Sequence, residues 1–220
     1  MKTCALCLSL MLCLVSPVVA GDKFGLALKT GKSWTNMHVK EKSTGNIVDT
    51  DRVRESTYLL EAEIVITKHL SYVGGLQYLA HGYSARAIDS VFAYRYWRRA
   101  TYVGFANKLR VLVLRGKVQP FFSVGLNAES LLSAQFRRDY DDASIQDSEI
   151  DTKVLFDESA FTPELEIGIR YKLAGFYLTL EGAYARGNEN VNNVDLEEFA
   201  THERRIRDWR LLIGISTYVF

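Results

Sequence analysis

Two pairs of glutamates have the type and spacing for acid–base chemistry. Glu61 and Glu63 lie two residues apart, as do Glu164 and Glu166, and residues two apart on a β-strand point to the same face. Paired carboxylates are the catalytic groups of most glycoside hydrolases. Basic residues also lie on polar strand faces, however, and buried charges are tolerated when they are paired. We therefore expect a structural network of ion pairs inside the fold, made by Glu61, Glu63, Lys108, Arg110, Glu129, Glu164, Glu166, Arg170 and Glu181.

A histidine and a serine are candidates for a base and a nucleophile. His81 and Ser84 lie near the end of one predicted strand, and an enzyme acting on lipid or peptide would need such a pair. No sequence motif surrounds them. The other histidines, His38, His69 and His202, are scattered along the chain, which argues against a metal site. The sequence therefore predicts no catalytic residue, no cofactor and no metal.

One polar segment is rich in carboxylates and suggests calcium binding. Its acidic residues are Asp139, Asp141, Asp142, Asp147, Glu149 and Asp151. Their order lacks the D-x-[DN]-x-[DN]-G spacing of a calcium-binding loop. We therefore expect a solvated acidic loop.

A second segment mixes aromatic and basic residues. It runs from Phe92 to Arg99 and contains Arg95, Tyr96, Trp97, Arg98 and Arg99. Aromatic rings suit a membrane interface, and arginines suit the phosphates of lipid head groups. Contact with lipid head groups and ordinary loop decoration are both open interpretations of this segment.

Alternating apolar and polar residues over much of the chain predict β-strands. Between Tyr58 and Ile66, apolar side chains occupy every second position, and Glu61 and Glu63 lie between them. This pattern is typical of a strand with one apolar and one polar face. The eight predicted strands span roughly residues 22–30, 57–67, 71–84, 100–113, 118–132, 159–171, 176–186 and 208–220.

Short and long connections alternate between these strands. The short ones lie at about 68–70, 114–117 and 172–175, and the long polar ones at about 31–56, 85–99, 133–158 and 187–207. Outer-membrane barrels have short periplasmic turns and long external loops. The sequence therefore predicts an all-β fold, an eight-stranded antiparallel transmembrane up-and-down β-barrel with four long external loops.

A soluble eight-stranded barrel of the lipocalin type is the competing architecture. It would place the apolar side chains inside and the charges outside, and alternation alone is compatible with both. The alternating turns and loops, the N-terminal segment and the aromatic residue at position 220 favour the membrane barrel.

The N-terminal segment has the pattern of a bacterial signal peptide. Lys2 precedes an apolar run from Ala5 to Val15, and small residues follow up to Ala20. The run is shorter than the roughly 20 residues of a membrane-spanning helix. We therefore expect a signal peptide at residues 1–20, an outer-membrane barrel domain at residues 21–220, and location in a bacterial outer membrane.

Removal of this segment changes both the cysteine content and the charge. Cys4, Cys7 and Cys13 all lie within it, so the mature chain has no disulfide. The totals of 27 basic and 26 acidic residues become 26 and 26, because Lys2 is the only charged residue removed. A chain without a basic excess is not expected to bind nucleic acid.

The last predicted strand ends with two aromatic residues on one face. Tyr218 and Phe220 are two positions apart, which is typical of the signal by which barrel assembly machinery recognises its substrates. We expect this machinery, outer-membrane lipid and lipopolysaccharide to be partners, together with other envelope or secretion proteins.

Three segments resemble the porin-like outer-membrane β-barrel proteins of Bacteroidetes, a group that includes PorT-like proteins. They are Ala100–Arg110, Val118–Ala128 and Thr217–Phe220. Ala106 and Leu126 stand where that family has prolines. The residues that match its motifs are Tyr102, Lys108, Gln119, Pro120, Phe121 and Gly125. The resemblance implies a membrane barrel and a role as a PorT-like accessory of protein secretion across the outer membrane.

Three functional hypotheses follow from these patterns. The first is a non-enzymatic outer-membrane barrel with a closed or narrow lumen, which displays surface loops for envelope integrity, adhesion or assembly. The second is the PorT-like secretion accessory. The third is a barrel enzyme that acts on lipid or surface peptide.

The signal peptide leads to the first testable prediction. We expect the exported protein to begin at Gly21, because the small residues before it form a signal-peptidase site. Mass spectrometry of the protein from the membrane fraction measures this directly. Retention of Met1 in that fraction would contradict the prediction.

Overall fold

The computed structural model describes the backbone of residues 24–41, 47–89, 92–140, 148–151, 159–188 and 202–219. Within these ranges the secondary structure consists of ten strands: β1 (Phe24–Glu41), β2 (Ile47–Asp49), β3 (Asp51–Val65), β4 (Leu70–Asp89), β5 (Phe92–Leu112), β6 (Val118–Tyr140), β7 (Ser148–Asp151), β8 (Ser159–Lys172), β9 (Tyr177–Asn188) and β10 (His202–Val219). The described part of the chain contains no helix with the length and hydropathy needed to cross a membrane. The predicted signal peptide and Phe220 lie outside the described residues.

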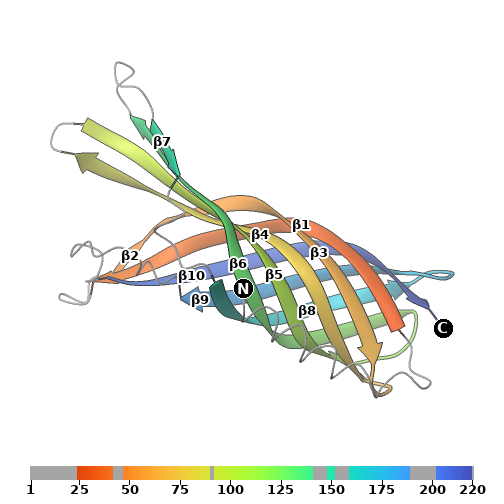
Figure 1. The fold of residues 1–220 in the computed structure, drawn as a ribbon. Coiled ribbons are helices and arrows are strands. Elements are labelled where there is room, and N and C mark those ends of the chain that lie inside the picture. Colours follow the sequence, from red (N-terminus) through yellow and green to blue (C-terminus); the bar gives the residue numbers. More distant parts are fainter. Residues whose placement is uncertain are drawn as a thin grey trace.

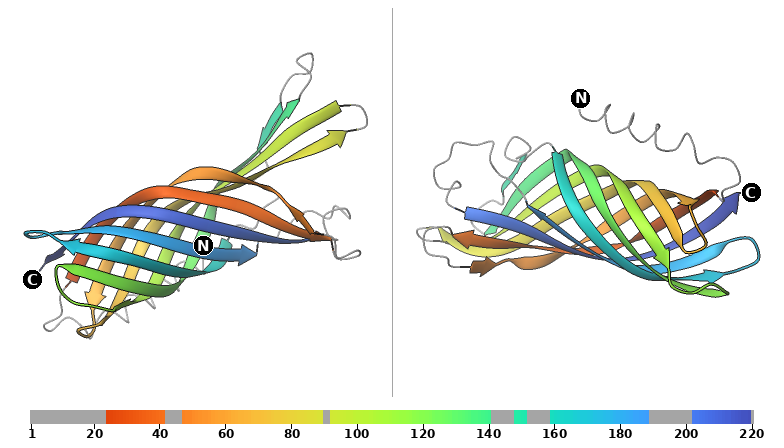
Figure 2. Two further views of the ribbon diagram at one scale, coloured as in Figure 1. Left: turned by 180° about the vertical axis from the view of Figure 1, so that it is seen from behind. Right: turned by 90° about the horizontal axis from the view of Figure 1, so that it is seen from below.

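Eight of these strands form a closed antiparallel barrel (Figures 1 and 2). They follow one another around the wall in the order β1, β3, β4, β5, β6, β8, β9 and β10. The barrel closes where β1 pairs with β10 along all 18 of its residues, from Phe24 opposite Val219 to Glu41 opposite His202. The prediction of an eight-stranded up-and-down barrel is confirmed.

Three short turns lie at the same end of the barrel as Phe24 and Val219. They connect β3 to β4, β5 to β6, and β8 to β9. Gly116 and Gly175 lie in the second and third turns with φ of 152° and 110°, a region that only glycine adopts without strain. Each turn therefore reverses the chain within a few residues, as the sequence predicted.

At the opposite end the strands are longer than predicted. Much of each predicted long loop is strand: β1 continues to Glu41, β4 to Asp89 and β6 to Tyr140. Outside a bilayer both faces of a strand meet water, so the alternation of apolar and polar residues disappears although the backbone stays paired. The outer parts of β4, β5 and β6, together with β7, rise above the barrel as a sheet (Figure 1). We call residues 84–89, 92–99, 135–140 and 148–151 the protruding sheet.

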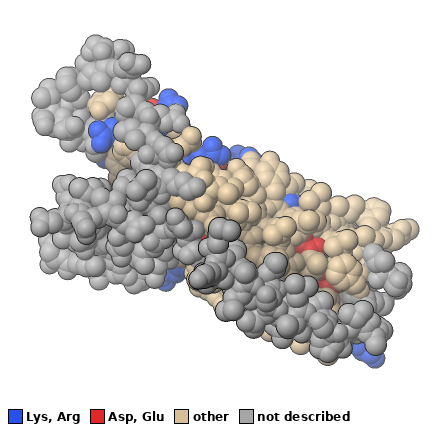
Figure 3. Space-filling model, in the orientation of Figure 1, with Lys and Arg blue, Asp and Glu red and all other residues tan. Residues whose placement is uncertain are grey.

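The outer wall of the barrel is apolar. Ile167 is 73% exposed, whereas Glu166 beside it is 2% exposed. The large apolar side chains of this band include Leu26, Leu28, Leu60, Leu76, Leu109, Phe122, Val124, Leu126, Leu165, Leu180, Leu211, Ile213 and Ile215. Among the described residues, the one charged side chain that faces outward in the band is Lys32 on β1, the register partner of Leu211, and its Nζ atom donates to Ser56 Oγ at 2.8 Å. The barrel surface in Figure 3 is mostly tan. The faces are those of a membrane barrel and the reverse of a lipocalin.

Asn107 interrupts the apolar band on β5. Its Oδ1 atom accepts a hydrogen bond of 2.7 Å from the hydroxyl of Tyr72 on the adjacent strand β4. A polar group facing hydrocarbon is costly unless it is hydrogen-bonded. The cross-strand bond therefore explains how the band tolerates one amide.

This pairing predicts a coupling between two substitutions. Asn107→Leu alone leaves the Tyr72 hydroxyl without this acceptor, and Tyr72→Phe alone leaves the amide without this donor. We expect each to lower the free energy of unfolding by about 1–2 kcal/mol, and the double variant to recover most of the loss. Guanidinium unfolding in lipid vesicles measures it. Strictly additive losses would contradict the coupling.

Candidate functional site

The interior of the barrel contains the charged residues that alternate with the apolar band. All nine residues of the predicted network point inward from β3, β5, β6, β8 and β9, and none is more than 6% exposed. Long charged side chains from several strands therefore share a lumen that eight strands make only about wide enough for side chains to fill.

Lys108 on β5 is the centre of this network. Its Nζ atom lies 3.1 Å from Glu61 Oε1 on β3 and 3.0 Å from Glu164 Oε1 on β8, and it also contacts Glu166. One ammonium group therefore connects strands that are not neighbours in the wall. It neutralises charge and holds the two sides of the barrel together across the axis.

Three further charged residues, which are not among the nine predicted from the sequence, join the network. Lys29 on β1 has its Nζ atom 2.6 Å from both Glu61 Oε2 and Glu181 Oε2. Arg210 and Asp208 on β10 form a pair of 3.1 Å. A signal was present, because Lys29 follows Leu28 and precedes Thr30, and both β10 residues alternate with apolar residues.

At the short-turn end, two arginines surround one aromatic ring. Arg110 Nη1 lies 3.1 Å from Glu63 Oε2, and Arg170 contacts the same carboxylate. The guanidinium carbons of the two arginines lie 4.5 and 5.4 Å from the ring centroid of Phe121. Arg170 also donates to the hydroxyl of Tyr218. Tyr218, predicted as part of an assembly signal, therefore also packs into the end of the lumen.

At the long-loop end, polar and then apolar side chains fill the lumen. His81 Nε2 lies 3.5 Å from Glu129 Oε2, and the ring of Tyr102 lies 5.4 Å from the His81 ring. Tyr102 belongs to a buried cluster with Leu131, Ala100 and Ala134. Buried side chains of the described residues therefore lie in the lumen at both ends as well as at its centre.

Glycines make room for the long charged side chains. Seven buried charged residues each stand opposite a glycine in the strand register: Glu61 with Gly75, Glu63 with Gly25, Glu129 with Gly104, Lys108 and Glu164 with Gly125, Glu181 with Gly168 and Lys29 with Gly214. A Cβ atom at Gly125 would lie 2.7 Å from Lys108 Cγ, and one at Gly214 would lie 2.5 Å from Lys29 Cγ. The alternation of large and small inward residues is what packs this lumen.

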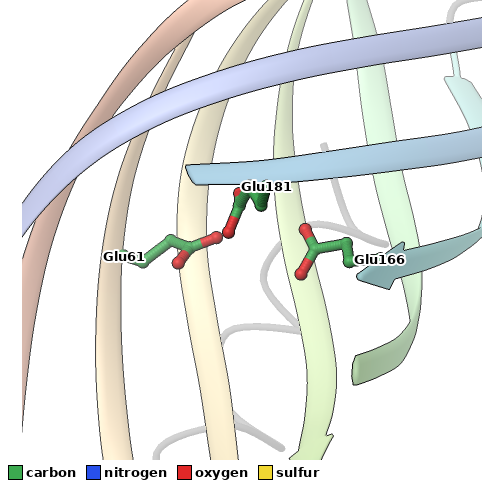
Figure 4. A group of neighbouring side chains, drawn as sticks. All are labelled: Glu61, Glu166 and Glu181. Carbon is green, nitrogen blue, oxygen red and sulfur yellow. The ribbon is translucent and has the colours of Figure 1, made fainter. Parts of the chain in front are cut away.

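Three of the carboxylates lie close enough together to suggest a metal site (Figure 4). Oxygen atoms of Glu61, Glu166 and Glu181 lie within 4.8 Å of one another. Protein cations already occupy their surroundings, because Lys29 bridges two of them and Arg110 Nη2 lies 3.6 Å from Glu166 and 3.9 Å from Glu181. An ion-pair network accounts for the cluster better than a metal centre does.

Carboxylates outnumber lysine and arginine side chains in the ion-pair network. There are seven carboxylates (Glu61, Glu63, Glu129, Glu164, Glu166, Glu181 and Asp208) and five cations (Lys29, Lys108, Arg110, Arg170 and Arg210), an excess of two. Neutral side chains donate hydrogen bonds to two of these carboxylates. Asn127 Nδ2 donates to Glu164 at 2.5 Å, and Gln77 Nε2 donates to Glu129 at 3.5 Å.

The other candidate sites do not assemble. His81 and Ser84 lie three residues apart on the regularly paired strand β4, so their side chains point to opposite faces and form no base–nucleophile pair. Asp139 lies on β6, where it accepts a bond of 2.5 Å from Arg137. Of the other predicted acidic-loop residues, Glu149 and Asp151 lie on β7, whereas Asp141, Asp142 and Asp147 lie outside the described residues.

The five residues of the segment expected to contact lipid head groups, 95–99, lie on two different faces. The segment is part of β5 and not a loop, so Arg95, Trp97 and Arg99 face one side and Tyr96 and Arg98 face the other. Arg98 is 8% exposed, and its Nη1 atom donates to the Tyr83 hydroxyl at 3.0 Å. The five residues therefore cannot all contact one lipid head group, although the three on the outward face lie together.

Comparison with known proteins finds solved structures with a similar fold. Neither a protein-family model nor a curated protein sequence matches the chain. The solid-state NMR structure of outer membrane protein AlkL in DMPC bilayers is similar, with 11% identity, 90% of each chain covered and a TM-score of 0.52. The fold is that of an outer-membrane β-barrel. This barrel also matches OprG from Pseudomonas aeruginosa (9% identity, 90% of this chain and 97% of that one, TM-score 0.47) and Neisserial surface protein A (11%, 88% and 96%, TM-score 0.40).

The central position of Lys108 yields a prediction about stability. Lys108→Met removes the cation that three glutamates share, so we expect the free energy of unfolding to fall by about 3–5 kcal/mol. Arg99→Met is the control, because its pair with Glu55 is partly exposed and should contribute about 0–1 kcal/mol. Urea unfolding of the refolded barrel compares them. Equal stability of the two variants would show that Lys108 is not buried among charges.

Proposed function

We propose that the protein is a non-enzymatic outer-membrane barrel that displays a surface structure and does not act as a wide pore. The filled lumen carries this proposal. Lys108 and Arg110 reach from β5 to carboxylates on β3 and β8, and Phe121 and Tyr102 occupy the two ends of the network. A continuous column of water has no room between such side chains.

The proposed location follows from the outer wall. An apolar band around a closed barrel suits the hydrocarbon of a bilayer, where backbone groups have no other partners. Export by the signal peptide at residues 1–20 and delivery by the barrel assembly machinery, which would read Tyr218 and Phe220, belong to this proposal. The proposal includes no binding of nucleic acid.

The proposed display element is the protruding sheet. Its parts of β4, β5 and β6 continue strands of the barrel wall, with a register shift between β5 and β6 at Thr101 and Tyr102, and β7 pairs with β6. Envelope integrity, adhesion and assembly of other surface proteins are the roles that such an element can serve. Arg95, Trp97 and Arg99 lie on its outward face, where contact with outer-membrane lipid or lipopolysaccharide would anchor its base.

Two other functions remain as candidates. A PorT-like role in secretion is supported by the resemblance at Ala100–Arg110 and Val118–Ala128, and a secretion defect on gene deletion would favour it. An enzyme acting on lipid or surface peptide would need a base and a nucleophile on one face, which His81 and Ser84 do not provide.

Conductance tests the proposal. We expect the refolded protein in planar bilayers to show no large steady channel, because the ion pairs of the lumen span its axis. A sixteen-stranded porin in the same bilayer is the positive control. Circular dichroism and heat-dependent gel migration verify that the barrel is folded and inserted. Steady porin-like conductance from folded protein would refute the closed lumen.

A further inference from the structure

Two arginines stand directly opposite each other on the outer wall. Arg186 on β9 and Arg207 on β10 are partners in the strand register, and such partners have Cβ atoms about 4.5–5.5 Å apart. No carboxylate of the described residues forms a salt bridge with either one. Like charges in this position repel each other, so the arrangement favours a shared anion.

A row of aromatic rings lies next to these arginines on the side of the apolar band. Tyr184 and Trp209 are also register partners, with ring centroids 4.5 Å apart, and Trp209 is 52% exposed. The following outward residue on β10 is Leu211, where the apolar band begins. The two arginines therefore lie at the boundary between the band and the long-loop end of the barrel.

The same arrangement continues onto the neighbouring strands. Trp34 on β1 is the register partner of Trp209, and Arg54 on β3 lies with its guanidinium carbon 5.8 Å from the centroid of the Trp34 ring. Strands β9, β10, β1 and β3 lie side by side in this order (Figure 2). We call Arg54, Arg186, Arg207, Trp34, Tyr184 and Trp209 the arginine–aromatic patch.

We propose that the arginine–aromatic patch binds a membrane lipid whose head group carries a phosphate monoester. Guanidinium groups bind phosphate oxygens through paired, charge-assisted hydrogen bonds. The facing pair of Arg186 and Arg207 carries two positive charges, which match the charge of a monoester, about −1.5 to −2 at neutral pH, better than the single charge of a diester. Exposed rings beside an apolar band suit the acyl end of the same molecule, which favours a lipid over free phosphate.

This inference rests on the proposed membrane location but concerns a different wall of the barrel from the protruding sheet. Arg95, Trp97 and Arg99 lie on β5, whereas the patch is on β9, β10, β1 and β3. A lipid held there would neutralise the facing pair of Arg186 and Arg207. It would also cover the exposed face of Trp209.

The test uses a full-length mature barrel in phosphatidylcholine nanodiscs. Trp97→Phe leaves Trp34 and Trp209, both in the patch, as the only tryptophans of the three in the chain, so tryptophan fluorescence reports on the patch. The probes are bisphosphorylated lipid A, its dephosphorylated form, phosphatidylglycerol and inorganic phosphate. We expect saturable binding of bisphosphorylated lipid A, and at least a tenfold loss of affinity in Arg186→Gln/Arg207→Gln, since charge-assisted hydrogen bonds each contribute about that much.

Arg115→Gln/Lys117→Gln is the matched control. It removes two positive charges at the other end of the band, where Lys117 lies 5.2 Å from the Tyr171 ring centroid, and it should bind lipid A as the parent does. Equal loss in both double variants, no loss in Arg186→Gln/Arg207→Gln, equal binding of dephosphorylated lipid or phosphatidylglycerol, or displacement by inorganic phosphate would each overturn the inference. A folded, non-conducting barrel that fails to bind would refute this site and leave the closed-barrel proposal intact.

Discussion

Hydrocarbon offers no hydrogen-bond partner to a peptide group, and this constraint governs the whole molecule. Every strand in the band must pair on both sides, so the sheet has to close, and β1 meets β10 for that reason. A closed sheet of eight strands has one face in lipid and one face around a narrow lumen. The polar side chains of each alternating strand then point inward, where each charged group needs a partner of opposite charge.

The inward charges also hold the barrel in shape. Backbone pairing joins each strand only to its neighbours, whereas Lys108 joins β5 to β3 and to β8. The glycines opposite the long side chains, such as Gly125 and Gly214, give those stems room to cross the axis. Sheet closure and lumen packing therefore depend on each other, because the glycines weaken the strands that the ion pairs then support.

The sequence predicted the part of the fold that lies between lipid and lumen, because two different surroundings impose alternation there. Glu61 and Glu166 were recognisable for this reason. Where both faces meet water the period disappears, so the sequence predicts a loop at Arg95 to Arg99 although they lie on β5. Lys29 and Arg210 carry the same signal, because each follows an outward apolar residue in its strand. Arg186 and Arg207 face each other because of the register between two strands, and the sequence of one strand alone does not determine that register.

The seam between β1 and β10 has a consequence for how the barrel is made. It joins the first and last strands in chain order, so it closes the longest loop of any strand pair, and its entropic cost comes before its hydrogen bonds are complete. Until β10 is in place, both seam strands have open edges that would pair with any other chain. Folding in water would therefore compete with aggregation, and a protected route into the bilayer becomes part of the protein's physical requirements.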